Sequence, residues 1–211
     1  TGDNPFKKKE VRQALYQAID IEAIKKKVMR GLSEPAGIIT FPGVTGYTKA
    51  LDKRLPYDVD AAKKLLADAG YPNGFDVELR CPNDRYVNDE AICTAVVGML
   101  GKIGVNVNLF AQTKSKHFKE LKDDQGDFYM LGWGVPTLDS HYVFHYLYET
   151  GASWNKVNFS DADVDAAIRV MEGEVDLDKR NAAIAKAWKI VRDNIAYLPC
   201  LLYTSPSPRD S

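Results

Sequence analysis

The chain has 211 residues, of which 45% are hydrophobic, 10% aromatic and 27% charged. This composition is typical of a folded globular protein and excludes extensive disorder. Its 28 basic and 29 acidic residues give a net charge of -1, so it lacks the excess positive charge by which nucleic-acid-binding proteins neutralise phosphates. No apolar run approaches the roughly 20 residues that a membrane-spanning helix needs. We therefore expect a soluble chain that contacts neither nucleic acid nor, by itself, a membrane.

The first third of the chain predicts helices separated by a long loop. Apolar residues recur at helical spacing over Glu10–Ile19, and Asp20 is placed to cap a second helix that runs through Met29. Three prolines and three glycines make Ser33–Pro56 an extended loop. Asp58 is then placed to cap a further helix, which Gly70 ends.

The middle of the chain predicts three strands that alternate with helices. Phe75–Leu79 and Val105–Leu109 alternate in polarity, and Phe128–Leu131 is a continuous apolar run. The helices between them are expected from a cap at Asn88 to Gly104 and around His117–Leu121. The order βαβαβ predicts an α/β fold with a mostly parallel sheet, right-handed crossovers and ligand-binding loops at the carboxyl ends of the strands.

The last third predicts three helices. They are expected near Ser140–Tyr148, from a cap at Ser160 through Met171, and over Leu177–Asn194. The last helix has an apolar stripe typical of a helix that packs on a sheet. Because no repeat or linker interrupts the pattern, we expect one α/β domain.

Both ends of the sequence are unusual. The chain opens at Thr1 without the segments of a secretion signal, so we expect its natural N-terminus to lie upstream. Tyr203–Ser211 has two prolines and no apolar periodicity, and Cys200–Asp210 is similar to a translated sequencing-library adapter. We therefore assign residues 1–199 to the folded domain and residues 200–211 to a read-through tail, in which Cys200 has no chemical role. A natural Ser/Pro-rich tail is the alternative.

The loop Pro82–Asp89 follows the first predicted strand and contains Arg85 and Tyr86 shortly before a helix N-terminus. A guanidinium, a phenol and a helix N-terminus all suit an anionic ligand group. The alternative is that Arg85 pairs with Asp84 or Asp89 at the surface.

The loop after the third predicted strand contains Trp133 between two glycines, followed by Asp139. Glycines beside an indole allow a flat ligand or a backbone to approach closely, and Gly134 is the candidate for such an approach. Asp139 can accept hydrogen bonds from an ammonium group, or it can cap the helix that begins at Ser140. Both roles can coexist because a carboxylate has two oxygens.

His141 and His145 stand four residues apart, the spacing that presents two imidazoles to one metal ion on a helix. The sequence shows no obvious third ligand, so we assign neither a metal site nor a cofactor. It also contains no recognisable catalytic motif. Cys93 falls within a predicted helix and is expected to be buried, and whether it is bridged to Cys81 stays open.

Short motifs follow one another in a specific order and spacing from Asn4 to Pro199. They are Asn4-Pro5-Phe6, Val11–Leu15, Ala18-Ile19-Asp20, Ala61–Leu66, Ala69–Pro72, Asn83–Tyr86, Gly132–Gly134 and Asp178–Arg180. Together they resemble solute-binding protein family 5, the peptide and nickel class that serves bacterial ABC importers. The resemblance implies the C-terminal lobe of a two-lobed, periplasmic-binding-protein-like fold.

This resemblance also implies a function and a site. The protein would capture dipeptides or oligopeptides, with Arg85 on the ligand carboxylate and Asp139 on its ammonium, and with Tyr86, Trp133 and Gly134 beside them. It would work with the permease and ATPase subunits of an importer, in the periplasm or anchored outside the cell by a lipid, and it would have no catalytic activity.

Two questions stay open: the length of the ligand and the type of function. The segment Val135–Leu138 departs from the acidic or Asp-Pro-rich loop of many relatives, so the length of the ligand is undecided. The rival functions are a small α/β hydrolase that uses Asp139 and His141, and the binding of a nickel chelate by the same fold.

Overall fold

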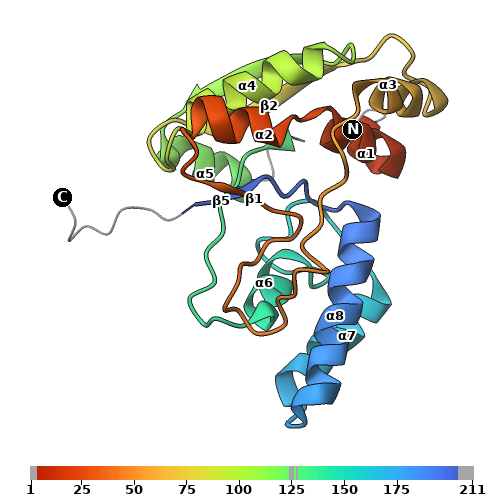
Figure 1. Ribbon diagram of the computed structural model, residues 1–211, viewed down its shortest axis with the longest axis vertical. Coiled ribbons are helices and arrows are strands. Elements are labelled where there is room, and N and C mark those ends of the chain that lie inside the picture. Colours follow the sequence, from red (N-terminus) through yellow and green to blue (C-terminus); the bar gives the residue numbers. More distant parts are fainter. Residues whose placement is uncertain (1–3, 124–125, 127, 204–211) are drawn as a thin grey trace. The chain divides into compact units, whose positions relative to one another are not determined.

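The computed structural model describes residues 4–123, 126 and 128–203 (Figure 1). The chain forms two compact units, and each is described by itself. The first comprises Thr1–Pro35, Leu55–Gly132 and Cys200–Ser211, and the second comprises Ala36–Arg54 and Trp133–Pro199. The assignment of residues 1–199 to one lobe stays a prediction, and the expectations for Thr1 and for residues 204–211 lie outside the described residues.

A three-stranded parallel sheet lies in the first unit. Its central strand is β2 (Asp76–Pro82), with β3 (Asn106–Gln112) on one side and β4 (Phe128–Tyr129) on the other. The parallel pairing predicted from the βαβαβ order is confirmed: Leu79 of β2 stands opposite both Leu109 and Phe128. The carboxyl ends of β2 and β4 therefore lie next to each other at one edge of the sheet.

The described part of the first unit contains five α-helices and two shorter helical turns. They are α1 (Lys9–Ala18), α2 (Ile21–Ala23), α3 (Val59–Asp68), α4 (Asp89–Gly101) and α5 (Lys114–Lys122), with a 3-10 turn η1 (Pro5–Lys7) and a π-helical turn η2 (Ile24–Val28). The Asp20 carboxylate accepts the N–H of Ala23, and that of Asp58 accepts the N–H of Ala61, as N-caps do. The helix predicted through Met29 is instead a short α-helix that continues as the π-helical turn.

The core of the first unit is formed by the apolar stripes of these helices. Helix α1 packs on α3, and α4 packs on β2 and β3. Leu15, Leu66 and Leu100 are completely or almost completely buried. A short antiparallel pair, β1 (Glu34–Pro35) with β5 (Leu201–Leu202), also belongs to this unit. Strand β5 lies within the segment that the sequence pattern assigned to a tail, and that assignment stays a prediction.

Three helices dominate the second unit: α6 (Ser140–Leu147), α7 (Ala162–Gly173) and α8 (Leu177–Asn194). The predicted stripe of α8 is buried, but it packs on α7 and on Phe144 of α6 rather than on a sheet. The predicted cap at Ser160 is wrong, because the carboxylate of the next residue, Asp161, accepts the N–H groups of the first turn of α7.

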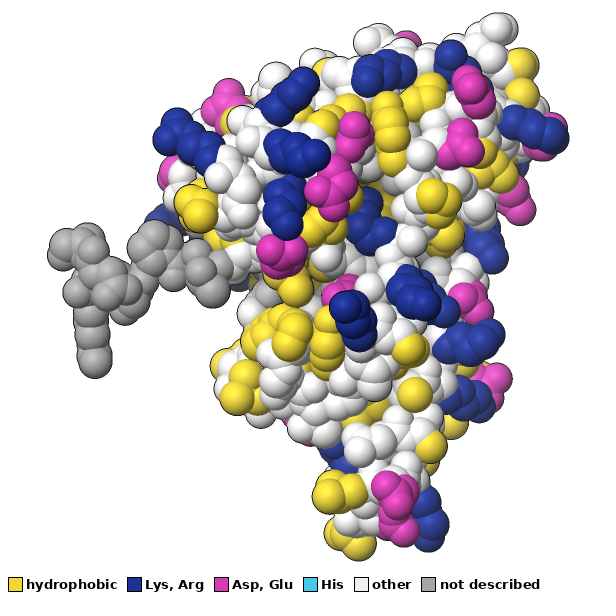
Figure 2. All heavy atoms as spheres, in the orientation of Figure 1, with side chains coloured by type: hydrophobic (Ala, Val, Ile, Leu, Met, Phe, Trp, Pro, Cys, Tyr) yellow, Lys and Arg dark blue, Asp and Glu magenta, His cyan; other side chains and the backbone are white. Residues whose placement is uncertain are grey.

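The surface shows no concentration of one charge on the face drawn in Figure 2, where basic and acidic side chains are interspersed. This distribution agrees with the net charge of -1 and gives this face no basic footprint for nucleic acid. Among the described helices, none combines the length and the apolar character needed to cross a membrane.

Substitution of two glycines by alanine is expected to change the free energy of unfolding in opposite directions. Gly74 has φ +75°, and a Cβ there would overlap the carbonyl group of Gly104, whereas Gly98 lies within α4 and a Cβ there would meet no atom within 4 Å. We expect Gly74→Ala to lower the free energy of unfolding by about 2 kcal/mol or more, because both the backbone angle and the contact are violated. Gly98→Ala should raise it by about 0.5–1 kcal/mol, because alanine favours the helix. Urea denaturation measures both, and equal effects of the two substitutions would contradict these expectations.

Candidate functional site

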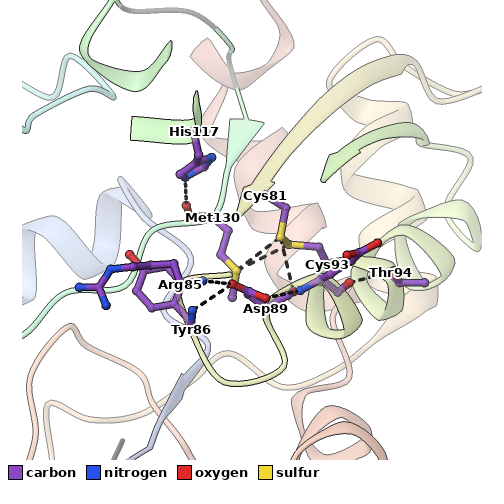
Figure 3. Close-up of a disulfide and its surroundings, with 9 residues drawn as sticks. Cys81, Arg85, Tyr86, Asp89, Cys93, Thr94, His117 and Met130 are labelled. Atoms are coloured by element: carbon purple, nitrogen blue, oxygen red, sulfur yellow. Dashed lines mark hydrogen bonds between the residues drawn. A yellow bond between two sulfur atoms is a disulfide. The ribbon is translucent and has the colours of Figure 1, made fainter. Parts of the chain in front are cut away.

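The carboxylate of Asp89 organises the loop that follows β2. Asp89 begins α4 and is only 4% exposed. One of its oxygens accepts the backbone N–H groups of Arg85 and Tyr86, each at 2.9 Å, and the other accepts the N–H of Glu90 at 3.0 Å (Figure 3). Asn88 occupies the predicted N-cap position, but with φ 56° its side chain makes no cap hydrogen bond. The buried aspartate after it holds the loop instead.

Arg85 has no anionic partner among the described residues. Its guanidinium lies 5.2 Å from the centre of the Tyr86 ring and forms no salt bridge with any residue that the structure describes. The alternative pairing with Asp84 or Asp89 is not formed, because the first accepts the N–H of Lys114 and the second accepts only backbone N–H groups from this loop. The guanidinium points away from the interior of the loop (Figure 3). An exposed, unpaired guanidinium can bind a carboxylate through two hydrogen bonds.

Tyr86 connects the loops that follow β2 and β4. Its hydroxyl donates a hydrogen bond to the carbonyl oxygen of Gly132 at 3.2 Å. A Cβ on Gly132 would lie only 2.6 Å from the Tyr86 ring, so any other residue here would force this ring to shift. Burial raises the pKa of the Tyr86 phenol, although the Gly132 contact and the Arg85 charge oppose the shift. Tyr86 is therefore a neutral donor at physiological pH. Gly134, the other predicted glycine, meets no atom within 4 Å of its ideal Cβ position.

A disulfide between Cys81 and Cys93, which the sequence left open, closes this loop. It joins the end of β2 to α4, and Met130 places its sulfur 3.7 Å from Cys81 Sγ and 3.6 Å from Cys93 Sγ. Closing a loop of this length contributes about 3 kcal/mol in the chain-entropy model. Because Arg85 and Tyr86 lie between the two cysteines, the bridge restricts the segment that carries them.

Trp133 belongs to an aromatic cluster in the second unit. Its ring centre lies 6.0 Å from that of Tyr142, 5.9 Å from that of Tyr146 and 6.0 Å from that of Trp154. Its Nε1 is buried and has no hydrogen-bond partner among the described residues. A buried indole N–H normally has an acceptor, so this donor is an unsatisfied polar group of the cluster.

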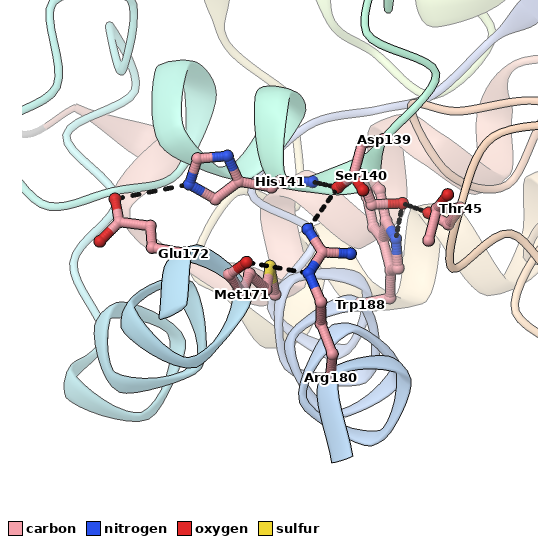
Figure 4. A network of polar contacts seen from close by, with 8 residues as sticks. All are labelled: Thr45, Asp139, Ser140, His141, Met171, Glu172, Arg180 and Trp188. Atoms are coloured by element: carbon pink, nitrogen blue, oxygen red, sulfur yellow. Dashed lines mark hydrogen bonds and ion pairs between the residues drawn. The ribbon is translucent and has the colours of Figure 1, made fainter. Parts of the chain in front are cut away.

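Asp139 caps helix α6, as one of the two predicted roles requires. Its Oδ1 accepts the N–H of His141 at 2.8 Å and also a hydrogen bond from Nη2 of Arg180 at 2.9 Å (Figure 4). Burial by itself would raise the pKa of Asp139, but the bonds from Arg180 and from the His141 N–H outweigh it, so the pKa lies below its usual value. The second oxygen, Oδ2, receives no hydrogen bond from the part of the chain that the structure describes.

The backbone around Asp139 is fixed on both sides by Thr45. The N–H of Thr45 donates to the carbonyl of Leu138 at 2.9 Å, and the carbonyl of Thr45 accepts the N–H of Ser140 at 3.2 Å and its hydroxyl at 2.7 Å. The buried Trp188 then donates its indole N–H to the Ser140 hydroxyl at 3.3 Å (Figure 4). The sequence did not indicate Thr45, Arg180 or Trp188 as supporting residues, because no local motif connects them to Asp139.

The predicted site residues are divided between the two units. Arg85 and Tyr86 lie together with Gly132 in the first unit, and Trp133, Gly134 and Asp139 belong to the second. The first unit offers an unpaired cation, and the second offers an aromatic wall and a carboxylate with one open oxygen. Groups of these kinds recognise small polar molecules without covalent chemistry.

The α/β fold and these loops can be compared with those of known protein families. The family model for bacterial extracellular solute-binding proteins, family 5 middle region, matches residues 1–155, which is more than half of the chain. The chain therefore belongs to this family, as the sequence motifs indicated.

Curated relatives are similar over most of this chain. The heme-binding protein A of Haemophilus influenzae is 27% identical over 207 residues, which cover 94% of this chain and 37% of the relative. The dipeptide-binding protein of Escherichia coli is 30% identical over 159 residues, which cover 74% of this chain and 30% of the relative. The chain thus spans about a third of the length of these relatives.

Solved structures show the same fold. A dipeptide-binding protein from Pseudoalteromonas sp. SM9913, in complex with Met-Leu, has a TM-score of 0.83 and 26% identity over 93% of this chain and 40% of the other. The protein AgaA from A. tumefaciens R10, in complex with agropinic acid, has a TM-score of 0.82 and 28% identity over 95% of this chain and 40% of the other. The periplasmic-binding-protein-like α/β fold predicted from the sequence is confirmed.

The ion pair between Asp139 and Arg180 predicts a pH-dependent contribution to stability. Asp139→Asn keeps the helix cap, because asparagine caps as well as aspartate, but it removes the charge opposite Arg180. The two side chains are 25% and 15% exposed, and for such a bond we expect a loss of about 1–2 kcal/mol at neutral pH. Because the native pKa lies below the ordinary value of 3.8, the contribution is complete above that value and is lost as the pH falls through the native pKa.

The stability difference between the wild type and Asp139→Asn should therefore narrow in acid, as measured by urea denaturation at neutral pH and at about pH 3. The control is Asp161→Asn, because Asp161 caps α7 but forms no salt bridge with any residue the structure describes. If Asp139→Asn is as stable as the wild type at neutral pH, the pair with Arg180 does not stabilise the fold. The same conclusion follows if the variant stays equally destabilised in acid.

Proposed function

We propose that this chain is a ligand-binding, non-catalytic part of a solute-binding protein that captures peptides for an ABC importer. The observation that carries this proposal is the unpaired guanidinium of Arg85, held on a loop fixed by Asp89 and by the Cys81–Cys93 bridge. A peptide carboxylate would supply the anion that this guanidinium lacks in the described chain. Relatives whose names or titles refer to dipeptides support the choice of ligand class.

The ammonium end of the ligand is assigned to Asp139. Its Oδ1 is already used by Arg180 and by the cap, so only Oδ2 can accept from the ligand. Because Arg180 also neutralises much of the carboxylate charge, this end should bind more weakly than the end at Arg85. We therefore expect an asymmetric site.

Trp133 is a further candidate contact for the ligand in the second unit. Its buried, unpaired Nε1 can donate to a peptide carbonyl, and the cluster with Tyr142, Tyr146 and Trp154 provides an apolar surface for a side chain. Tyr86 and Gly134 remain candidate contacts near the ligand.

The geometry does not favour the rival hydrolase. A hydrolytic pair would need the Asp139 carboxylate to orient the imidazole of His141. Instead, the carboxylate bonds to the backbone N–H of His141 and to Arg180, and the imidazole faces Glu172 at 3.5 Å. We therefore favour binding without turnover.

The proposed partners and location follow from the same role. The protein would deliver its ligand to the permease and ATPase subunits of the importer, in the periplasm or attached outside the cell by a lipid. The Cys81–Cys93 disulfide supports such a location, because disulfides persist in oxidising compartments.

Isothermal titration calorimetry on the complete protein that carries this chain tests the proposal. The ligands are a free dipeptide, its C-terminal amide and its N-acetyl derivative. We expect Arg85→Ala to weaken binding of the free dipeptide by about 2–5 kcal/mol, the cost of removing one partner of a buried charge pair. Asp139→Asn should weaken it less, because Arg180 already shares that carboxylate.

Matched ligands and variants make the assignment specific. Arg85→Ala should bind the amide and the free dipeptide with similar affinity, and Asp139→Asn should do the same for the N-acetyl and free forms. The control is Arg169→Ala, which removes an exposed guanidinium on α7 and should leave affinity unchanged. Unchanged affinity in both Arg85→Ala and Asp139→Asn would refute the site, and hydrolysis of the dipeptide would refute its non-catalytic character.

A further inference from the structure

A group of metal-binding side chains lies in the second unit, apart from the peptide contacts proposed above. It consists of His141 and His145 on α6 and Glu172 on α7, whose ligating atoms all lie within 4.8 Å of one another. The two imidazole rings are stacked, with centres 5.6 Å apart and planes inclined by 21°. The helical spacing of the histidines was visible in the sequence, whereas Glu172, which is 27 positions further along, becomes a neighbour only through the packing of α6 on α7.

The nitrogen atoms of this group are poorly satisfied by the protein. His141 Nε2 and His145 Nδ1 are buried atoms without a hydrogen bond of good geometry to any described residue. Carboxylate oxygens nevertheless lie close to both: Glu172 Oε1 is 3.5 Å from His141 Nε2, and Glu149 Oε2 is 2.8 Å from His145 Nδ1. The two imidazoles and the Glu172 carboxylate therefore meet in one place without hydrogen bonds that would explain their arrangement.

The donor set selects a chemical class of ion. Two imidazoles and a carboxylate are a common ligand set for Zn²⁺, and imidazole also suits other late transition metals, whereas Mg²⁺ and Ca²⁺ prefer oxygen ligands. Tetrahedral ligands about 2.1 Å from zinc are about 3.4 Å from one another. Starting from separations within 4.8 Å, the ligands need to move by only about 1 Å.

The side chains can make this movement and can be reached by an ion. The side chain of His141 is 28% exposed, that of His145 is 44% exposed and that of Glu172 is 47% exposed. We propose that His141, His145 and Glu172 bind one divalent transition-metal ion such as Zn²⁺, which links helix α6 to helix α7. A fourth position on the ion is left for water.

Zinc titration of the 211-residue chain tests this site. The chain is used without a histidine tag and in a Cys200→Ser background, because Cys200 is outside the disulfide and its partly exposed sulfur could bind zinc. The third histidine, His117, is completely buried and does not compete. Calorimetry with ZnCl₂ should show one ion per chain, and MgCl₂ should show no binding.

Two substitutions and one control assign the ligands. His145→Ala and Glu172→Gln should each weaken zinc binding by at least about tenfold. Zinc should also raise the melting temperature of the parent chain but not that of these variants, because an ion that binds only the folded state stabilises it. Glu90→Gln, the same charge change on an exposed residue of α4, should behave like the parent.

The outcomes are distinct from those of the peptide experiment. Absence of zinc binding by the parent, or equal affinity in Glu172→Gln and Glu90→Gln, would overturn the proposal. If His145→Ala does not fold, as judged by circular dichroism, the Glu172→Gln variant decides the question alone. Neither result depends on whether the protein binds peptides.

Discussion

The parallel pairing of β2 with its two neighbours is the constraint on which the first unit depends. It places the carboxyl ends of β2 and β4 at the same edge, so that the loop carrying Arg85 begins beside the segment that ends at Gly132. The hydrogen bond from Tyr86 to Gly132 exists because of this arrangement, and glycine at position 132 permits it. The disulfide and the buried Asp89 then fix the loop against α4. The disulfide and the Asp89 hydrogen bonds thus fix the loop that carries Arg85, which has no ionic partner in the described chain.

The charged residues of the two candidate loops differ in how many partners the protein gives them. Asp139 is satisfied by its helix cap and by Arg180, and its lowered pKa reflects those bonds. Arg85 instead lies over an aromatic ring and is open to an anion. A binding protein needs both properties, because a site must be rigid before the ligand arrives and must still keep part of its bonding capacity for the ligand. In the proposed function, the unpaired guanidinium of Arg85 and the open Oδ2 of Asp139 are the groups that stay available to the ligand.

The sequence predicted the elements well where the signals are local. Helix caps at Asp20 and Asp58, the parallel strand order and the loops with Arg85 and Asp139 follow from patterns within a few residues. It failed where a distant residue decides the outcome. Arg180 reaches Asp139 across 41 residues and Ser140 reaches Thr45 across 95, and no periodicity encodes such contacts. The cap of α7 was misplaced by one residue, because neighbouring polar residues compete for this role, and at α4 the predicted N-cap Asn88 makes no side-chain cap bond.

The most direct test of the central claim is a crystal structure of the complete protein with a bound dipeptide. We expect the ligand carboxylate to accept two hydrogen bonds from the guanidinium of Arg85, and Oδ2 of Asp139 to accept a hydrogen bond from the ligand ammonium while Arg180 stays on Oδ1. A bound dipeptide whose carboxylate is held by another cation, with Arg85 directed into solvent, would contradict the proposed mode of recognition.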